Sequence, residues 1–162
     1  MLGSDDGGER LALLFRDRIP VCWISSRFFN DVHGTCVCLT VCGSDDEYES
    51  SHTFRHLIGL AEWEIKELVD QLRDLLQFDR PLRFRNIGDT VLIEVPQSER
   101  MADEFAMRLE LYGSCRTVTR GEKGEILTHG VVLTLRHFTA TRESLTLFRE
   151  ALQNGLHGEY ED

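Results

Sequence analysis

The chain has 162 residues, and its 28 acidic and 18 basic side chains give a formal net charge of −10. A chain of this length buries enough apolar surface to fold as one domain without disulfides or metals. The negative charge argues against nucleic acids and anionic membranes as partners, because both attract a basic protein surface. It is compatible with a basic protein partner.

The chain is predicted to consist of an arm, one folded domain and a short tail. Residues 1–9 are polar and rich in glycine, and they lack the basic start and apolar core of a signal peptide, so we expect a flexible arm. Residues 10–154 contain no linker and are predicted to form a single α+β domain. Residues 155–162 are expected to be an acidic tail. No apolar stretch approaches the roughly 20 residues that span a membrane, and we expect a cytoplasmic protein.

The first sixty residues have the alternating, β-branched and aromatic composition of strands. The predicted strands cover residues 11–16, 21–29, 35–42 and 51–60. They are separated by a break at Arg18-Ile19-Pro20, a turn at residues 30–34 and a polar loop at residues 43–50.

A helix is predicted over residues 61–77, where apolar residues recur at helical spacing. They are Ile65, Leu68, Val69, Leu72, Leu75 and Leu76. Glu62 and Glu64 lie in the first turn, where they complement the helix dipole. Pro81 prevents the helix from continuing.

The second half repeats this plan. We predict a hairpin of residues 82–86 and 90–95, a strand over residues 103–112 that continues through residues 115–119 beyond a bulge at Gly113, and one long strand over residues 126–138. A second helix is expected to begin at the N-cap Thr141, with Glu143 in its first turn, and to run to about Asn154 before a stop at Gly155. The strands–helix–strands–helix order with short turns predicts an α+β fold of antiparallel β-sheets, with two amphipathic helices packed at one side or end.

The cysteines are interpreted as buried thiols of a reducing compartment. They are Cys22, Cys36, Cys38, Cys42 and Cys115. On one strand, Cys36 and Cys42 would lie about 20 Å apart, so they cannot hold the same ion. The sequence has no Cys-x-x-Cys pair, and we predict neither a metal nor a cofactor.

An enzyme or small-ligand binder is the alternative that the polar residues leave open. His52, His56 and Cys115 could supply a nucleophile and a base in a cleft between sheet and helix. The sequence contains no Gly-x-Ser-x-Gly motif and no phosphate-binding glycine loop, so we predict no catalytic residue from the motifs.

The acidic residues are concentrated. Residues 41–80 carry ten acidic and four basic side chains, a balance of −6. This concentration, with aromatic residues beside it, predicts a docking surface for a basic protein. The predicted partner-binding residues are Asp45, Asp46, Glu47, Tyr48, Glu49, Glu62 and Trp63.

Four segments give residues 10–154 a recognisable layout: the helix EWEIKELVDQLRDLL at 62–76, the strands FAMRLELY at 105–112 and GVVLTLRHF at 130–138, and the closing helix ESLTLFREAL at 143–152. This layout resembles that of WapI-type bacterial immunity proteins and of related small actinobacterial domains. The resemblance implies a cytoplasmic, non-catalytic inhibitor that blocks a basic, nuclease-like toxin. It transfers no site residues. A phage or mobile-element inhibitor of a host defence protein is the other binding role that an acidic surface allows.

Overall fold

The computed structural model describes the backbone of residues 9–16, 19–32, 34–45, 52–88, 90–111, 114–121, 124–131 and 134–158. It describes the side chains of residues 22–32, 34–43, 57–88, 90–111 and 137–158. The predicted arm at residues 1–8 and the end of the predicted tail at residues 159–162 lie outside these ranges.

The described residues form strands and helices in the predicted strands–helix–strands–helix order, and the α+β class is confirmed. The elements are β1 (Glu9–Arg16), β2 (Ile19–Asp31), β3 (Gly34–Asp45), β4 (His52–Leu60), α1 (Glu62–Phe78), β5 (Leu82–Arg85), β6 (Val91–Val95), β7 (Glu104–Leu111), β8 (Ser114–Gly121), β9 (Gly124–Val131), β10 (Thr134–Thr141) and α2 (Arg142–Leu156).

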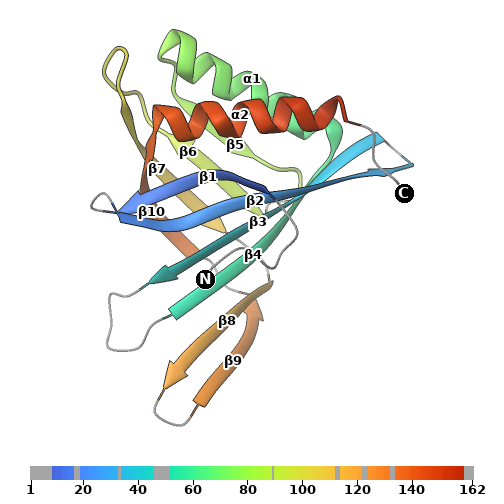
Figure 1. Cartoon of the computed structure of the whole chain (residues 1–162), viewed down its shortest axis with the longest axis vertical. Coiled ribbons are helices and arrows are strands. Elements are labelled where there is room, and N and C mark those ends of the chain that lie inside the picture. Colours follow the sequence, from blue (N-terminus) through green and yellow to red (C-terminus); the bar gives the residue numbers. More distant parts are fainter. Residues whose placement is uncertain are drawn as a thin grey trace.

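The strands pair antiparallel in the order β5-β6-β7-β10-β1-β2-β3-β4-β8-β9. The strands β5-β6-β7-β10 are joined to the strands β1-β2-β3-β4-β8-β9 through pairing of β10 with β1. This pairing involves two residue pairs, Leu14 with Ala140 and Phe15 with Thr139. Both helices lie side by side over the same part of the sheet, and the β8–β9 hairpin projects away from them (Figure 1).

Two predicted breaks in the first half have the wrong bounds. β2 begins at Ile19, so Pro20 lies inside this strand, opposite Phe15, where the β1–β2 register shifts. Such an irregularity is one of the places at which a sheet tolerates proline. The predicted loop at residues 43–50 starts too early, because β3 runs on to Asp45 and its last residue pairs with His52.

Two predicted strands of the second half are also wrong. Residues 115–119 belong to β8, which pairs with β4 and β9 and does not extend β7. Residues 126–138 are divided between β9 and β10. β9 lies at one end of the sheet, whereas β10 pairs with β7 and β1 in its middle. The alternation of apolar residues continues across this change of partner and does not reveal it.

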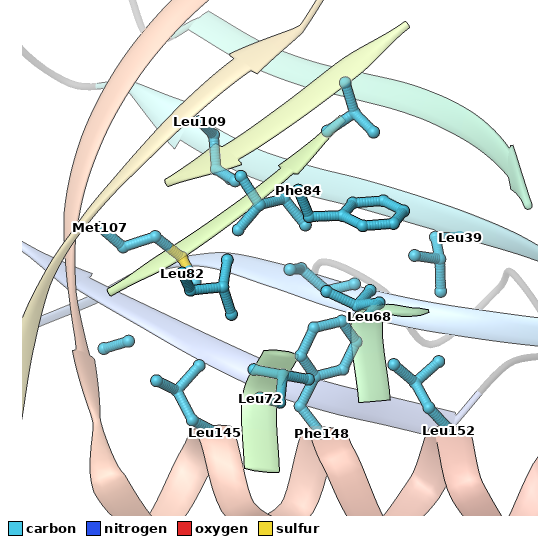
Figure 2. Close-up of a cluster of buried hydrophobic side chains, with 14 of the residues drawn as sticks. Leu39, Leu68, Leu72, Leu82, Phe84, Met107, Leu109, Leu145, Phe148 and Leu152 are labelled. Atoms are coloured by element: carbon cyan, nitrogen blue, oxygen red, sulfur yellow. The ribbon is translucent and has the colours of Figure 1, made fainter. Parts of the chain in front are cut away.

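The core lies between the sheet and the two helices. Val37, Leu39 and Val41 alternate along β3 and are at most 2% exposed. Side chains from both helices and from the sheet meet in this layer (Figure 2). They include Leu68 and Leu72 of α1, Leu145, Phe148 and Leu152 of α2, Leu39 of β3, Leu82 and Phe84 of β5, and Met107 and Leu109 of β7.

The helix α2 begins as predicted, because the Thr141 hydroxyl accepts a hydrogen bond from the Ser144 N–H at 3.0 Å. Its predicted end is wrong, since the helix passes through Gly155 to Leu156. A Cβ at Gly155 would lie 2.1 Å from the Phe28 ring, so glycine is needed there for close approach to β2 rather than for a helix stop. The start of the predicted tail is therefore part of the folded domain.

Candidate functional site

Only some of the predicted docking residues lie among the described residues. Asp46, Glu47, Tyr48 and Glu49 lie outside the described residues. The backbone of Asp45 ends β3. Glu62 and Trp63 form the first turn of α1.

The register of β3 and β4 separates Asp45 from the start of α1. Asp45 pairs with His52 at one end of the β3–β4 hairpin, and Val37 pairs with Leu60 at the other end, directly before α1. Eight residues of strand separate the two ends, which is about 26 Å. The predicted surface that combined the 43–50 loop with the adjoining helix start stays a prediction for residues 46–50, which lie outside the described residues, and the site is built from the helix start alone.

One side of the helix start rests against the tip of the β2–β3 hairpin. Gly34 has a φ of 119°, and a Cβ at this residue would lie 2.9 Å from the Glu62 Oε2 atom. Glycine is therefore required by the backbone conformation, and the Glu62 carboxylate lies directly against it. The hairpin tip, with exposed Asp31 and Val32, is thereby placed next to the first turn of α1.

The other side of the helix start is tied to the β5–β6 turn by Glu64. This side chain is 3% exposed. Its Oε1 atom accepts the Ala61 N–H at 3.1 Å, and its Oε2 atom accepts the Ile87 N–H at 2.8 Å. One carboxylate therefore satisfies an N–H at the start of α1, where no earlier turn supplies an acceptor, and fixes a second segment to it.

Three large apolar side chains are exposed around this fixed base. Val32 is 94% exposed, Trp63 54% and Ile87 77%. Trp63 lies between two residues that contact other segments: Glu62 precedes it and lies close to Gly34, and Glu64 follows it and accepts the Ile87 N–H. We define the α1-start surface as Val32, Glu62, Trp63 and Ile87. Exposed apolar groups that gather in this way are typical of interaction sites.

The thiol of Cys36 lies beneath this surface and is 9% exposed. Burial is the main reason that its pKa is raised to about 11; a hydrogen bond with Asp31 and the negative charges of Asp31, Glu62 and Glu64 act in the same direction. The thiol is therefore protonated at neutral pH, and a protonated thiol is a poor nucleophile.

The other cysteines agree with the interpretation as thiols wherever their side chains are described. Cys22 and Cys42 are buried, Cys38 is half-buried, and none of these three is in a disulfide. Within the described ranges, no group of three or more His, Cys, Asp or Glu residues could hold a metal ion.

The residues of the enzyme alternative lie on β4 and β8. Arg55 pairs with Arg116, so His56 and Cys115 occupy the next positions on the two neighbouring strands. His52 pairs with Thr119, and four residues of strand, about 13 Å, separate it from His56. The register thus brings the backbone of His56 and Cys115 together and leaves His52 apart. Their side chains lie outside the described set.

Sequence reasoning missed Val32, Gly34 and Ile87. Each lies in or next to a predicted turn. An apolar residue within a turn, such as Val32 or Ile87, is the only sign in the sequence that an apolar side chain is exposed there. Comparisons with family models, curated proteins and solved structures find no match. In the part of the chain that the structure describes, neither helix is long and apolar enough to cross a membrane.

Proposed function

We propose that this chain is a non-catalytic binding protein that holds a basic protein partner at the α1-start surface. The observation that carries the proposal is Trp63, which is 54% exposed at a helix start that Glu64 binds to the β5–β6 turn and at which Glu62 lies close to Gly34. A large aromatic side chain on a rigid base loses little conformational freedom on binding, which is why such residues dominate interface energies.

The proposed biological role is that of an immunity protein. The partner would be a basic, nuclease-like bacterial toxin, and inhibition would be steric and electrostatic, with no bond made or broken. The net charge of −10 supports rapid capture of a basic partner. The resemblance of residues 10–154 to WapI-type immunity proteins supports the same role.

The test is co-expression with the toxin domain encoded beside this gene, followed by binding kinetics. We expect restored growth, a 1:1 complex and an association rate that falls as salt is raised. Trp63→Ala is expected to weaken binding about thirtyfold, as for an interface hot spot. The matched control is Leu57→Ala, since Leu57 is 56% exposed and adjoins buried Ile58 on β4. Equal effects of the two changes, or a rate that salt leaves unaltered, would refute the proposal.

Gene neighbourhood separates the two binding roles. A large toxin gene beside this one favours immunity, whereas surrounding phage genes favour inhibition of a host defence protein. In the second case, the same α1-start surface would be tested against the defence protein.

A second candidate function is an enzyme with a cysteine and a histidine on neighbouring strands. The observation that favours it is the strand register: Arg55 pairs with Arg116, and His56 and Cys115 are the next residues on these two strands. An activity lost in both Cys115→Ala and His56→Ala, and kept in His52→Ala, would support it. An activity that survives Cys115→Ala would exclude this pair as its origin.

A further inference from the structure

The outward face of α1 continues from the α1-start surface along the whole helix. Its exposed and half-exposed residues recur every three or four positions, which places them on one side of the helix. We define the α1 outward face as Trp63, Glu67, Asp70, Asp74 and Phe78. The helix spans residues 62–78, so the aromatic residues at its two ends stand about 22 Å apart along the axis.

The two ends of this face are apolar. Trp63 is 54% exposed and Phe78 is 59% exposed. On the opposite side of the same helix, Ile65, Leu68 and Leu72 are at most 1% exposed in the core. Trp63 and Phe78 are therefore not part of the core. The Arg80 guanidinium lies over the Phe78 ring, 5.4 Å from its centre, and the remaining exposed area of both aromatic side chains is apolar.

Carboxylates occupy the middle of the face. The side chain of Asp70 is 63% exposed and that of Asp74 is 31% exposed. Arg73 lies within 3.5 Å of both, and Arg80 lies 3.7 Å from Asp74. Pairs this exposed contribute little free energy, so a partner's cations can replace them at low cost.

The charge pattern selects the kind of occupant. A second copy lying antiparallel on α1 would place Glu67 opposite Asp74, and like charges across an interface are repulsive. Nucleic acids and anionic lipids are repelled in the same way. Exposed Lys66 borders this face near Trp63, but the helix and its end carry more acidic than basic side chains. A row of arginine or lysine side chains would therefore meet three carboxylates between two apolar ends.

We propose that the α1 outward face is the docking track for a basic segment of the protein partner. Basic side chains of the segment pair with Glu67, Asp70 and Asp74, and its apolar side chains pack on Trp63 and Phe78. This inference rests on the proposed function, which holds that the partner is a basic protein. It adds which surface binds that partner and which side chains recognise it.

The test uses a defined probe, an acetylated and amidated 18-residue peptide. Its arginines recur every three or four positions and it has leucine at both ends. The chain has two tryptophans, Trp23 and Trp63, so in a Trp23→Phe background the fluorescence of Trp63 reports binding. Two triple variants with the same charge change are compared, E67Q/D70N/D74N on the outward face and D45N/D46N/E47Q in the acidic run near the far end of β3.

We expect the outward-face triple to raise the dissociation constant at least tenfold, and the acidic-run triple to raise it less than threefold. A scrambled peptide of the same composition should bind at least tenfold more weakly. Asp70→Asn alone provides a second variant and should weaken binding two- to fourfold. Equal effects of the two triples would show attraction by net charge alone and would overturn the proposal.

The same variants separate this inference from the proposed function. If the chain neutralises a toxin and the outward-face triple binds that toxin as tightly as wild type, the docking track is refuted and the binding role stands. If the peptide binds the outward face and the toxin is not neutralised, the track stands and the immunity role is refuted.

Discussion

The Oε2 atom of Glu64 accepts a hydrogen bond from the backbone N–H of Ile87 at 2.8 Å, across 23 positions of sequence. The same carboxylate accepts the Ala61 N–H through its other oxygen. The sequence predicts Glu64 in the first turn of the helix, where it complements the dipole. The structure shows that Glu64 also holds the β5–β6 turn against α1. The position of Ile87 in the α1-start surface depends on this link.

Glu64→Ala is expected to lower the free energy of unfolding by about 2–3 kcal/mol, because two N–H groups lose a charged acceptor in a buried setting. Glu64→Gln keeps one acceptor oxygen and should cost about half as much. Urea unfolding followed by circular dichroism measures both. Glu67→Ala is the control, since Glu67 is exposed and its effect should stay within about 0.5 kcal/mol. A loss in Glu64→Ala no larger than in Glu67→Ala would contradict the assigned role.

Gly155→Ala should also destabilise the fold. The added methyl group would lie 2.1 to 2.5 Å from three carbons of the Phe28 ring, so α2 or β2 has to shift. We expect a loss of about 1–3 kcal/mol by chemical denaturation, as for other overpacked sites. Gly59→Ala is the matched control, because a Cβ at Gly59 meets nothing within 4 Å.

A double-mutant cycle tests whether the Phe28 ring is the cause. In a Phe28→Leu background, most of the added cost of Gly155→Ala should disappear, because the smaller side chain leaves room for the methyl group. An unchanged cost in that background would place the strain elsewhere in α2.

The helices were predictable because their signals are local. Six apolar residues of α1 recur at helical spacing within residues 61–77, and the observed helix runs from Glu62 to Phe78. The Thr141 hydroxyl accepts a hydrogen bond from the N–H of Ser144, which is only three residues further along the chain. The need for glycine at position 155 comes from the distant Phe28 ring and not from a helix stop, and no neighbour in sequence records that contact.

Strand partners were less predictable because pairing is not local. The apolar alternation of residues 126–138 is the same whether the segment forms one strand or two. Only the partners distinguish β9, which pairs with β8, from β10, which pairs with β7. The extended backbone of residues 115–119 was predicted, but its partner strand, β4, was not.

The candidate site was predicted in part. Glu62 and Trp63 lie at an exposed helix start, as the charge and aromatic pattern indicated. Asp45 was combined with them because it is close in sequence, whereas β4 carries the chain to the other end of the hairpin. Val32 and Ile87 join the surface through Gly34 and Glu64, and these long-range contacts leave no periodic signal.

Cys36 is expected to make stability depend on pH on the alkaline side. Burial, then the hydrogen bond with Asp31 and the charges of Asp31, Glu62 and Glu64, raise the pKa of its thiol from 9.0 to about 11. From pH 9 to 11 the unfolded chain has lost a proton that the folded chain keeps, so its contribution to stability is complete below pH 9 and is lost as the pH rises towards 11. The urea midpoint should therefore fall less in Cys36→Ala than in wild type between pH 8.5 and 11. Cys38→Ala, two residues along β3, is the control and should follow the wild-type curve; a Cys36→Ala curve as steep as that of wild type would show that other groups cause the loss.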